Sequence, residues 1–248
     1  MGLDQKEVRK MKAIVISGLG KKKGKNEALT SEFMRDCKFF IRYLIQSVGL
    51  KTSDVYFFKP NTVKIMRLWG LFESIKETIR LYPDETLLIF YSGHGERGYW
   101  NLQPYTKEER SYYFKFKRLL RILKKRNAPL IVVADCCHGM FIRKELKKLN
   151  YPWLLIGLSP ENKTGYGSVG QQAILYWSRG KNANPKYDNG SGRLIRFIKF
   201  KSYNKKFYGF KPDGKGGLRK FYFVSSYKIK KINLREGVDL DYLLFPKK

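Results

Sequence analysis

Two apolar stretches of this 248-residue chain end abruptly in side chains that carry chemistry at neutral pH. Residues 131–140 read IVVADCCHGM, and residues 87–95 read LLIFYSGHG. Short apolar runs rich in β-branched residues predict buried parallel strands, whose carboxyl ends meet at the edge of a sheet where ligands bind. The chain has only two histidines, His94 and His138, and two of its three cysteines directly precede His138. We therefore expect a reactive site at this sheet edge.

A cysteine and a histidine at neighbouring strand ends can act as a nucleophile and its base. A free thiol is mostly protonated at neutral pH, and a nearby imidazole raises the thiolate fraction or removes the proton during attack. Two glycines flank His94 and allow the backbone to approach a substrate carbonyl closely. The amides of Gly95 and Cys137 are candidates for an oxyanion hole.

The motifs YSGHG at 91–95 and DCCHG at 135–139 resemble those of the caspase-like cysteine peptidases, and of metacaspases most closely. His94 precedes Cys137 by 43 residues, close to the roughly 50 residues typical of caspases. The resemblance implies a cysteine endopeptidase in which Cys137, rather than Cys136, is the nucleophile. It also implies that Asp135 is an acid of the S1 pocket, and hence cleavage after Arg or Lys. One departure is that Gly139 follows His138 directly, where the family has a serine.

A second resemblance concerns the segment 158–168, LSPENKTGYGS, which looks like the metacaspase segment that follows the equivalent strand. It makes Glu161 a candidate for a second acid of the S1 pocket. A surface acid without a role in binding is the alternative for this residue.

The expected elements alternate between strand and helix, which predicts a mainly parallel sheet covered on both faces. Together with the resemblance, this predicts an α/β fold of the caspase-like three-layer α/β/α sandwich type with a six-stranded sheet. Strands are expected at 11–17, 55–58, 87–92, 130–134 and 154–158, and helices at 30–48, 69–82, 111–126, 141–149 and 171–177. Further segments are a hairpin at 99–105 and strands at 194–200 and 221–225, one of which should join the sheet edge.

The chain is divided into a polar tail at 1–10, a catalytic core at 11–177, and a basic C-terminal part of the same domain at 178–248. Residues 178–192 have the composition of a loop. A separate basic module in the last third is the lesser alternative.

Cofactors and targeting signals are not indicated. Few acidic residues lie near the motifs, so a calcium requirement is doubtful, and the cysteines and histidines lack zinc-ligand spacing. No run approaches 18 apolar residues, and the start MGLDQKEVRKMK has no hydrophobic signal region. Three cysteines, one of them a candidate nucleophile, favour a reducing, cytoplasmic location over a disulfide framework.

The formal net charge of +30 is the most unusual feature of the composition. Such a surface attracts nucleic acid and other polyanions without sequence preference. The favoured explanation of the charge is nevertheless a compositional habit, since Lys, Asn, Tyr, Phe and Ile are all plentiful. The alternative to an endopeptidase is therefore a catalytically silent caspase-like scaffold that binds nucleic acid or an acidic partner.

Overall fold

The computed structural model describes residues 11–18, 27–46, 49–59, 66–102, 113–157, 159, 161, 195–200, 206–212 and 219–225. For 27–32, 66–69 and the last three ranges only the backbone is described. The predicted tail at 1–10, the helix at 171–177 and the loop at 178–192 lie outside the described residues.

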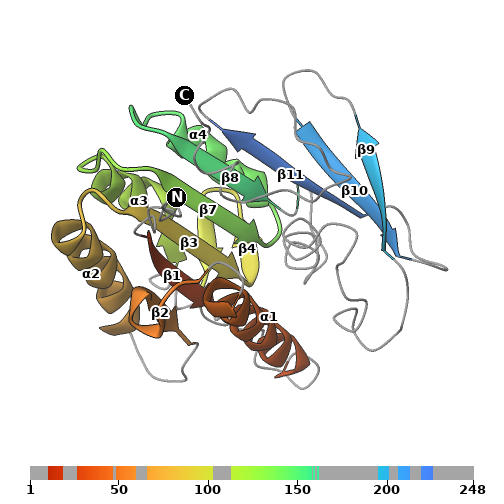
Figure 1. Ribbon diagram of the computed structural model, residues 1–248, viewed down its shortest axis with the longest axis horizontal. Helices are drawn as coiled ribbons and strands as arrows, with labels where there is room; N and C mark the ends of the chain where they lie inside the picture. Colours follow the sequence, from red (N-terminus) through yellow and green to blue (C-terminus); the bar gives the residue numbers. More distant parts are fainter. Residues whose placement is uncertain are drawn as a thin grey trace, which may run out of the picture.

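One large sheet forms the centre of the molecule, and its strands lie in the order β2-β1-β3-β7-β8-β11-β10-β9 (Figure 1). The first five strands in this order are parallel, and the last three continue the sheet in antiparallel fashion. Their bounds are β1 Met11–Ser17, β2 Val55–Phe58, β3 Thr86–Ser92, β7 Leu130–Asp135, β8 Trp153–Gly157, β9 Ile195–Phe200, β10 Lys206–Pro212 and β11 Arg219–Ser225.

The parallel strands follow the apolar runs of the sequence because central strands of a covered sheet must be apolar on both faces. Every residue of β1, β3, β7 and β8 is buried. The predicted strand bounds agree with these elements to within a residue. The predicted fold class, a mainly parallel sheet with helices on both faces, is confirmed.

Helices cover both faces of this sheet (Figure 1). The helix α1, Glu27–Gln46, contacts β1 and β3 on one face. On the other face, α2 Met66–Leu81, α3 Phe116–Leu123 and the short α4 Arg143–Leu146 share one apolar core with the strands. A 3-10 turn, η1 Thr52–Asp54, leads into β2, and another, η3 Gly139–Ile142, leads into α4. None of the described helices combines the length and apolar character needed to cross a membrane.

A small second sheet, of strand order β4-β5-β6, lies beside the carboxyl end of β3. Its strands are β4 His94–Glu96, β5 Tyr99–Asn101 and β6 Tyr113–Lys115. Trp100 of β5 is fully buried and stacks on Tyr91 of β3, with ring centroids 4.6 Å apart. This stacking packs the small sheet against the large one, three residues before His94 in the chain.

Several predicted elements need correction. The large sheet has eight strands rather than six, because β10 and both predicted late strands join its edge. The first helix begins at Glu27, three residues before the predicted start at 30. The helix expected at 111–126 is shorter, because residues 113–115 pair with β5 as a strand. The segment 141–149 forms only η3 and one turn of α-helix.

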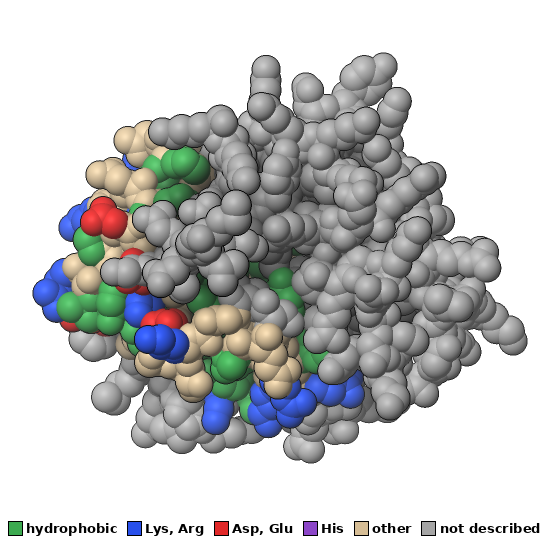
Figure 2. Space-filling view, in the orientation of Figure 1, with side chains coloured by type: hydrophobic (Ala, Val, Ile, Leu, Met, Phe, Trp, Pro, Cys, Tyr) green, Lys and Arg blue, Asp and Glu red, His purple; other side chains and the backbone are tan. Residues whose placement is uncertain are grey.

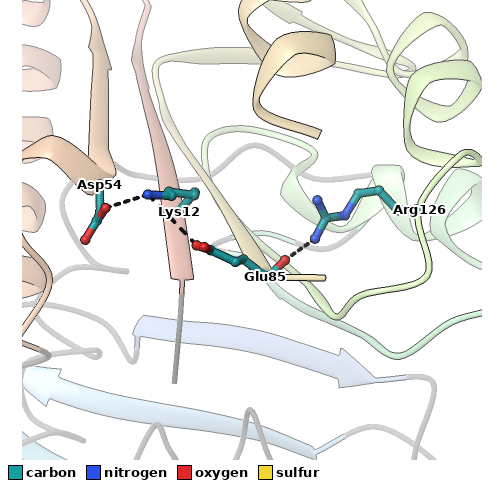
Figure 3. Close-up of polar contacts among 4 residues, drawn as sticks. All are labelled: Lys12, Asp54, Glu85 and Arg126. Carbon is teal, nitrogen blue, oxygen red and sulfur yellow. Dashed lines mark hydrogen bonds and ion pairs between the residues drawn. The ribbon is translucent and has the colours of Figure 1, made fainter. Parts of the chain in front are cut away.

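The opposite edge of the sheet, at the amino ends of the strands, carries a buried ionic cluster (Figure 3). Lys12 Nζ lies 2.6 Å from Asp54 Oδ1 and 3.9 Å from Glu85 Oε2. The same ammonium lies 3.9 Å from the ring centroid of Tyr82, and Arg126 donates a hydrogen bond to the Glu85 carbonyl. This cluster ties β1 to the residues before β2 and β3.

We expect Lys12→Ala to lower the free energy of unfolding by about 1–3 kcal/mol, because it leaves two partly buried carboxylates without their cation. The matched control is Lys76→Ala, which breaks a solvent-exposed ion pair with Glu73 and should cost at most about 0.5 kcal/mol. Urea unfolding followed by circular dichroism measures both. Equal losses in the two variants would contradict a stabilising role for the cluster.

Candidate active site

The two motifs meet at the carboxyl edge of the large sheet. Strands β3 and β7 are parallel neighbours, and Ser92 pairs with Asp135 at their ends. Two residues further along, the chain reaches His94 in one case and Cys137 in the other. Ser92 and Asp135 are 43 residues apart in the sequence, and so are His94 and Cys137. His94 and Cys137 therefore stand at equivalent positions, each two residues beyond a paired strand end.

The loops that follow these strands are in direct contact at Gly95. A Cβ atom at this position would lie 2.1 Å from the Cys137 carbonyl oxygen and 2.7 Å from Cys136 Sγ. Neither distance is sterically possible, so the contact between the two motifs depends on the missing side chain. The glycine after His94 is thus required for the close approach of the histidine loop to the cysteine loop.

His94 is held by contacts on several sides. It is the first residue of β4 and pairs with Asn101 of β5. The buried Tyr91 hydroxyl lies 2.7 Å from the His94 carbonyl oxygen and donates to it. The imidazole meets the Phe33 ring edge-to-face, with centroids 5.3 Å apart, and its Nε2 atom is buried. These contacts fix the position of the His94 ring at the end of β3.

The cysteines differ in accessibility. Cys136 is only 4% exposed, and its thiol packs in the core near the Trp100 indole. Burial raises the pKa of the Cys136 thiol well above its usual range, and burial likewise raises the pKa of Cys37. Cys137 is partly exposed. Of the three thiols, that of Cys137 is therefore the most accessible to solvent.

The backbone turns sharply after the nucleophile candidate. His138 has a left-handed conformation, with φ 54° and ψ 26°, and it directly precedes the 3-10 turn η3. Its Nδ1 atom lies 3.0 Å from the Glu161 carbonyl oxygen. The Ser159 hydroxyl also contacts this turn, through Cys136 and Gly139. The segment after β8 thus braces the turn that carries Cys137.

Asp135 lies deep in the structure beside a second acid that the sequence analysis missed. The two carboxylates belong to Asp135, which is 2% exposed, and to Asp36 of α1, which is 4% exposed. Burial raises the pKa of Asp135 well above its usual range, and the negative charge of Asp36 adds to this effect. Neither carboxylate oxygen of Asp135 has a hydrogen-bond partner among the described residues. The Ser92 hydroxyl lies 3.5 Å from Asp36 Oδ2.

A signal for Asp36 was present in the sequence. The acid stands on the apolar stripe of its helix, next to Cys37 and between Phe33 and Phe40, all of which are buried. Buried acids are rare unless they are paired or have a function. An acid on the core-facing stripe of an amphipathic helix is therefore a reason to look for a site.

Glu161, the predicted second acid of the S1 pocket, has other partners. Its carboxylate oxygens lie 3.9 Å from Arg143 Nη1 and 3.6 Å from Lys144 Nζ. The acid next to Asp135 is Asp36. The structure thus favours the surface-acid alternative for the Glu161 side chain, while its backbone carbonyl contacts His138.

Metal-binding residues do not gather in the described part of the chain, where no group of three or more His, Cys, Asp or Glu side chains is arranged to hold an ion. The chemistry available to the described site is that of a thiol, an imidazole and two buried carboxyls.

No protein-family model matches this chain, and no curated protein matches it in sequence. Among solved structures, it is similar to caspase-1 from Spodoptera frugiperda, with a TM-score of 0.44 and 14% identity over 70% of this chain and 73% of that one. It is also similar to Raptor from Chaetomium thermophilum, with a TM-score of 0.34 and 15% identity. That match covers 60% of this chain and only 16% of Raptor.

Proposed function

We propose that this protein is a cysteine endopeptidase that cleaves peptide bonds after Arg or Lys, with Cys137 as nucleophile and His94 as base. The observation that carries the proposal is the contact at Gly95, which brings the loop of His94 against the loop of Cys137. The accessible thiol and the well-supported imidazole are the two groups that such a reaction needs. The resemblance of both motifs to those of metacaspases supports the same assignment.

In this mechanism His94 takes the proton of the Cys137 thiol as the sulfur attacks the scissile carbonyl carbon. The carbonyl oxygen becomes an oxyanion, which the amides of Gly95 and Cys137 stabilise. The C–N bond then breaks, and the leaving amine receives the proton from His94. Water, deprotonated by the same imidazole, attacks the thioester, releases the acid product and restores the thiol.

The preference for a basic P1 residue follows from the two buried acids. Both carboxyls lie deep in the structure, and buried carboxyls are suited to a ligand that brings a positive charge. A guanidinium supplies two parallel charge-assisted hydrogen bonds, and an ammonium supplies a point charge. We therefore assign Asp135 and Asp36, with the Ser92 hydroxyl beside them, to the S1 pocket.

The alternative is a silent scaffold that binds a polyanion. The exposed side chains of α3 are strongly basic, and Figure 2 shows Lys and Arg side chains along the rim of the described face. The exposed cations on and next to α3 are Lys115, Lys117, Arg118, Arg121, Lys124 and Lys125. A charged face of this kind is compatible with an active peptidase, so only turnover separates the two functions.

The test is hydrolysis of reporter peptides that differ only at P1, measured under reducing conditions. We expect Arg and Lys to exceed neutral residues by at least about ten- to a hundredfold in kcat/KM, because each charge-assisted hydrogen bond contributes about 1.5–3 kcal/mol. Peptides with Asp at P1 should not be cleaved, and a calcium chelator should not change the rates. Cleavage after Asp would refute the assigned pocket. No turnover of any peptide, with or without calcium, would favour the scaffold.

A further inference from the structure

Ser159 is inserted into the turn that carries the nucleophile. It is only 1% exposed, and all its described polar contacts go to this turn. Its hydroxyl donates to the Cys136 carbonyl at 2.9 Å and accepts from the Gly139 N–H at 3.0 Å. Its carbonyl accepts from the Met140 N–H at 3.0 Å. One buried residue thus bridges both sides of Cys137.

The turn needs additional contacts to hold its backbone conformation. His138, the residue after Cys137, has a left-handed backbone with φ 54°, which is unfavourable for a residue other than glycine. The turn therefore keeps this shape because surrounding contacts impose it. The Ser159 hydroxyl spans the strained residue, from the carbonyl before Cys137 to the amide after His138.

The bond to the Cys136 carbonyl also orients the amide of Cys137. The described chain has no cis peptide bonds, and in a planar trans peptide the C=O and the following N–H point in opposite directions. A hydroxyl that holds the Cys136 carbonyl therefore directs the Cys137 N–H away from Ser159. This N–H is one of the two donors assigned above to the oxyanion hole, whose effect depends on orientation before the reaction begins.

We propose that Ser159 is a positioning residue whose hydroxyl sets the Cys136–Cys137 peptide plane, so that the Cys137 N–H is directed at the oxyanion. The inference rests on the proposed function, since the oxyanion forms only if Cys137 attacks a carbonyl. It predicts that Ser159 acts on the transition state and leaves the S1 pocket and the thiol unchanged.

The experiment compares Ser159→Ala with the wild-type protein on an Arg-ending reporter peptide. We expect kcat to fall by at least about tenfold with little change in KM, because the misoriented donor matters only when charge develops on the oxygen. Ser159→Thr, which keeps the hydroxyl, should recover most of the loss. Thr78→Val is the matched control, since Thr78 is a buried hydroxyl on α2 that bonds to the Ser74 carbonyl and contacts neither motif.

A pair of inhibitors separates positioning from a general structural role. A peptide argininal reacts with the Cys137 thiol, so that an S–C bond forms, the thiol proton passes to His94 and the aldehyde oxygen becomes an oxyanion in the oxyanion hole. The corresponding argininol cannot form this bond. Ser159→Ala should weaken binding of the argininal by the factor lost in kcat and leave binding of the argininol unchanged.

Equal weakening of both inhibitors, or an unchanged kcat in Ser159→Ala, would overturn the positioning role while the peptidase assignment stands. A wild-type protein that cleaves no peptide and binds neither inhibitor would overturn the proposed function and the positioning role with it. If Ser159→Thr does not fold, the argininal-to-argininol ratio of Ser159→Ala still decides.

Discussion

Replacement of Cys137 by alanine is expected to reduce hydrolysis of Arg- and Lys-ending peptides by several orders of magnitude. A nucleophile and its base act as one unit, so removal of the thiol leaves only the residual effect of substrate binding and of the oxyanion donors. The partly exposed position of Cys137 at the end of β7 is the structural reason for this assignment. Initial rates with a fluorogenic arginine peptide measure the loss.

Cys136→Ala is the matched control, because it removes the adjacent thiol. Cys136 is buried against Trp100, away from solvent, so this variant should keep most of its activity and lose only some stability. Iodoacetamide should modify one thiol in the native wild type and none in Cys137→Ala, since Cys37 is buried as well. An inactive Cys136→Ala that folds normally would show that the nucleophile is assigned one residue too late.

Asp135→Asn is expected to have opposite effects on activity and stability. Activity on Arg and Lys peptides should fall at least about ten- to a hundredfold, because the amide keeps the shape of the side chain but cannot pair with a cation. Stability at neutral pH should rise by about 1–3 kcal/mol, because the substitution removes a buried carboxylate whose described surroundings contain a second acid and no cation. A gain in stability combined with a loss of activity would indicate that Asp135 serves function rather than folding.

The stability gain of Asp135→Asn should depend on pH in a defined direction. The pKa of Asp135 is raised in the folded protein, so folding favours its protonated form. Stability of the wild type therefore falls as the pH rises from the unfolded-state pKa of about 3.9 through the raised folded-state value. The gain of the variant should be small near pH 4 and largest above the folded-state pKa. Thermal unfolding of both proteins between pH 4 and 8 measures it.

Two further variants identify the second acid of the pocket. Asp36→Asn should also weaken the preference for basic P1 residues, because Asp36 is the acid that faces Asp135. Glu161→Gln should leave that preference intact, since the Glu161 carboxylate lies beside Arg143 and Lys144. The reverse pattern would restore Glu161 to the pocket.

A loss of stability at neutral pH in Asp135→Asn would contradict the stability prediction. It would show that the Asp135 carboxylate has a cationic partner in the folded protein.

The sequence by itself determined the parallel part of the fold. Each of the runs at 11–17, 87–92 and 130–135 is a nearly continuous apolar strand, because a strand covered on both faces buries nearly all of its side chains. The polar exceptions, such as Lys12 and Asp135, stand near the ends of the strands. The order of these runs and the helices between them then implied a parallel sheet, whose carboxyl edge had to receive both motifs. The meeting of the two motifs at that edge could be predicted for that reason, whereas the choice of Cys137 over Cys136 came from the resemblance.

Only the tertiary structure determined which residues of separate elements contact one another in the site. The pairing of Asp36 with Asp135, the insertion of Ser159 into the nucleophile turn and the burial of Cys136 against Trp100 each join separate elements. The edge strands β9 to β11 likewise depend on long-range pairing. Local periodicity reports which face of an element is apolar, but it does not report which residue of a distant element meets that face. Those contacts between distant elements are determined by how the helices and strands pack, and they form only when the chain folds.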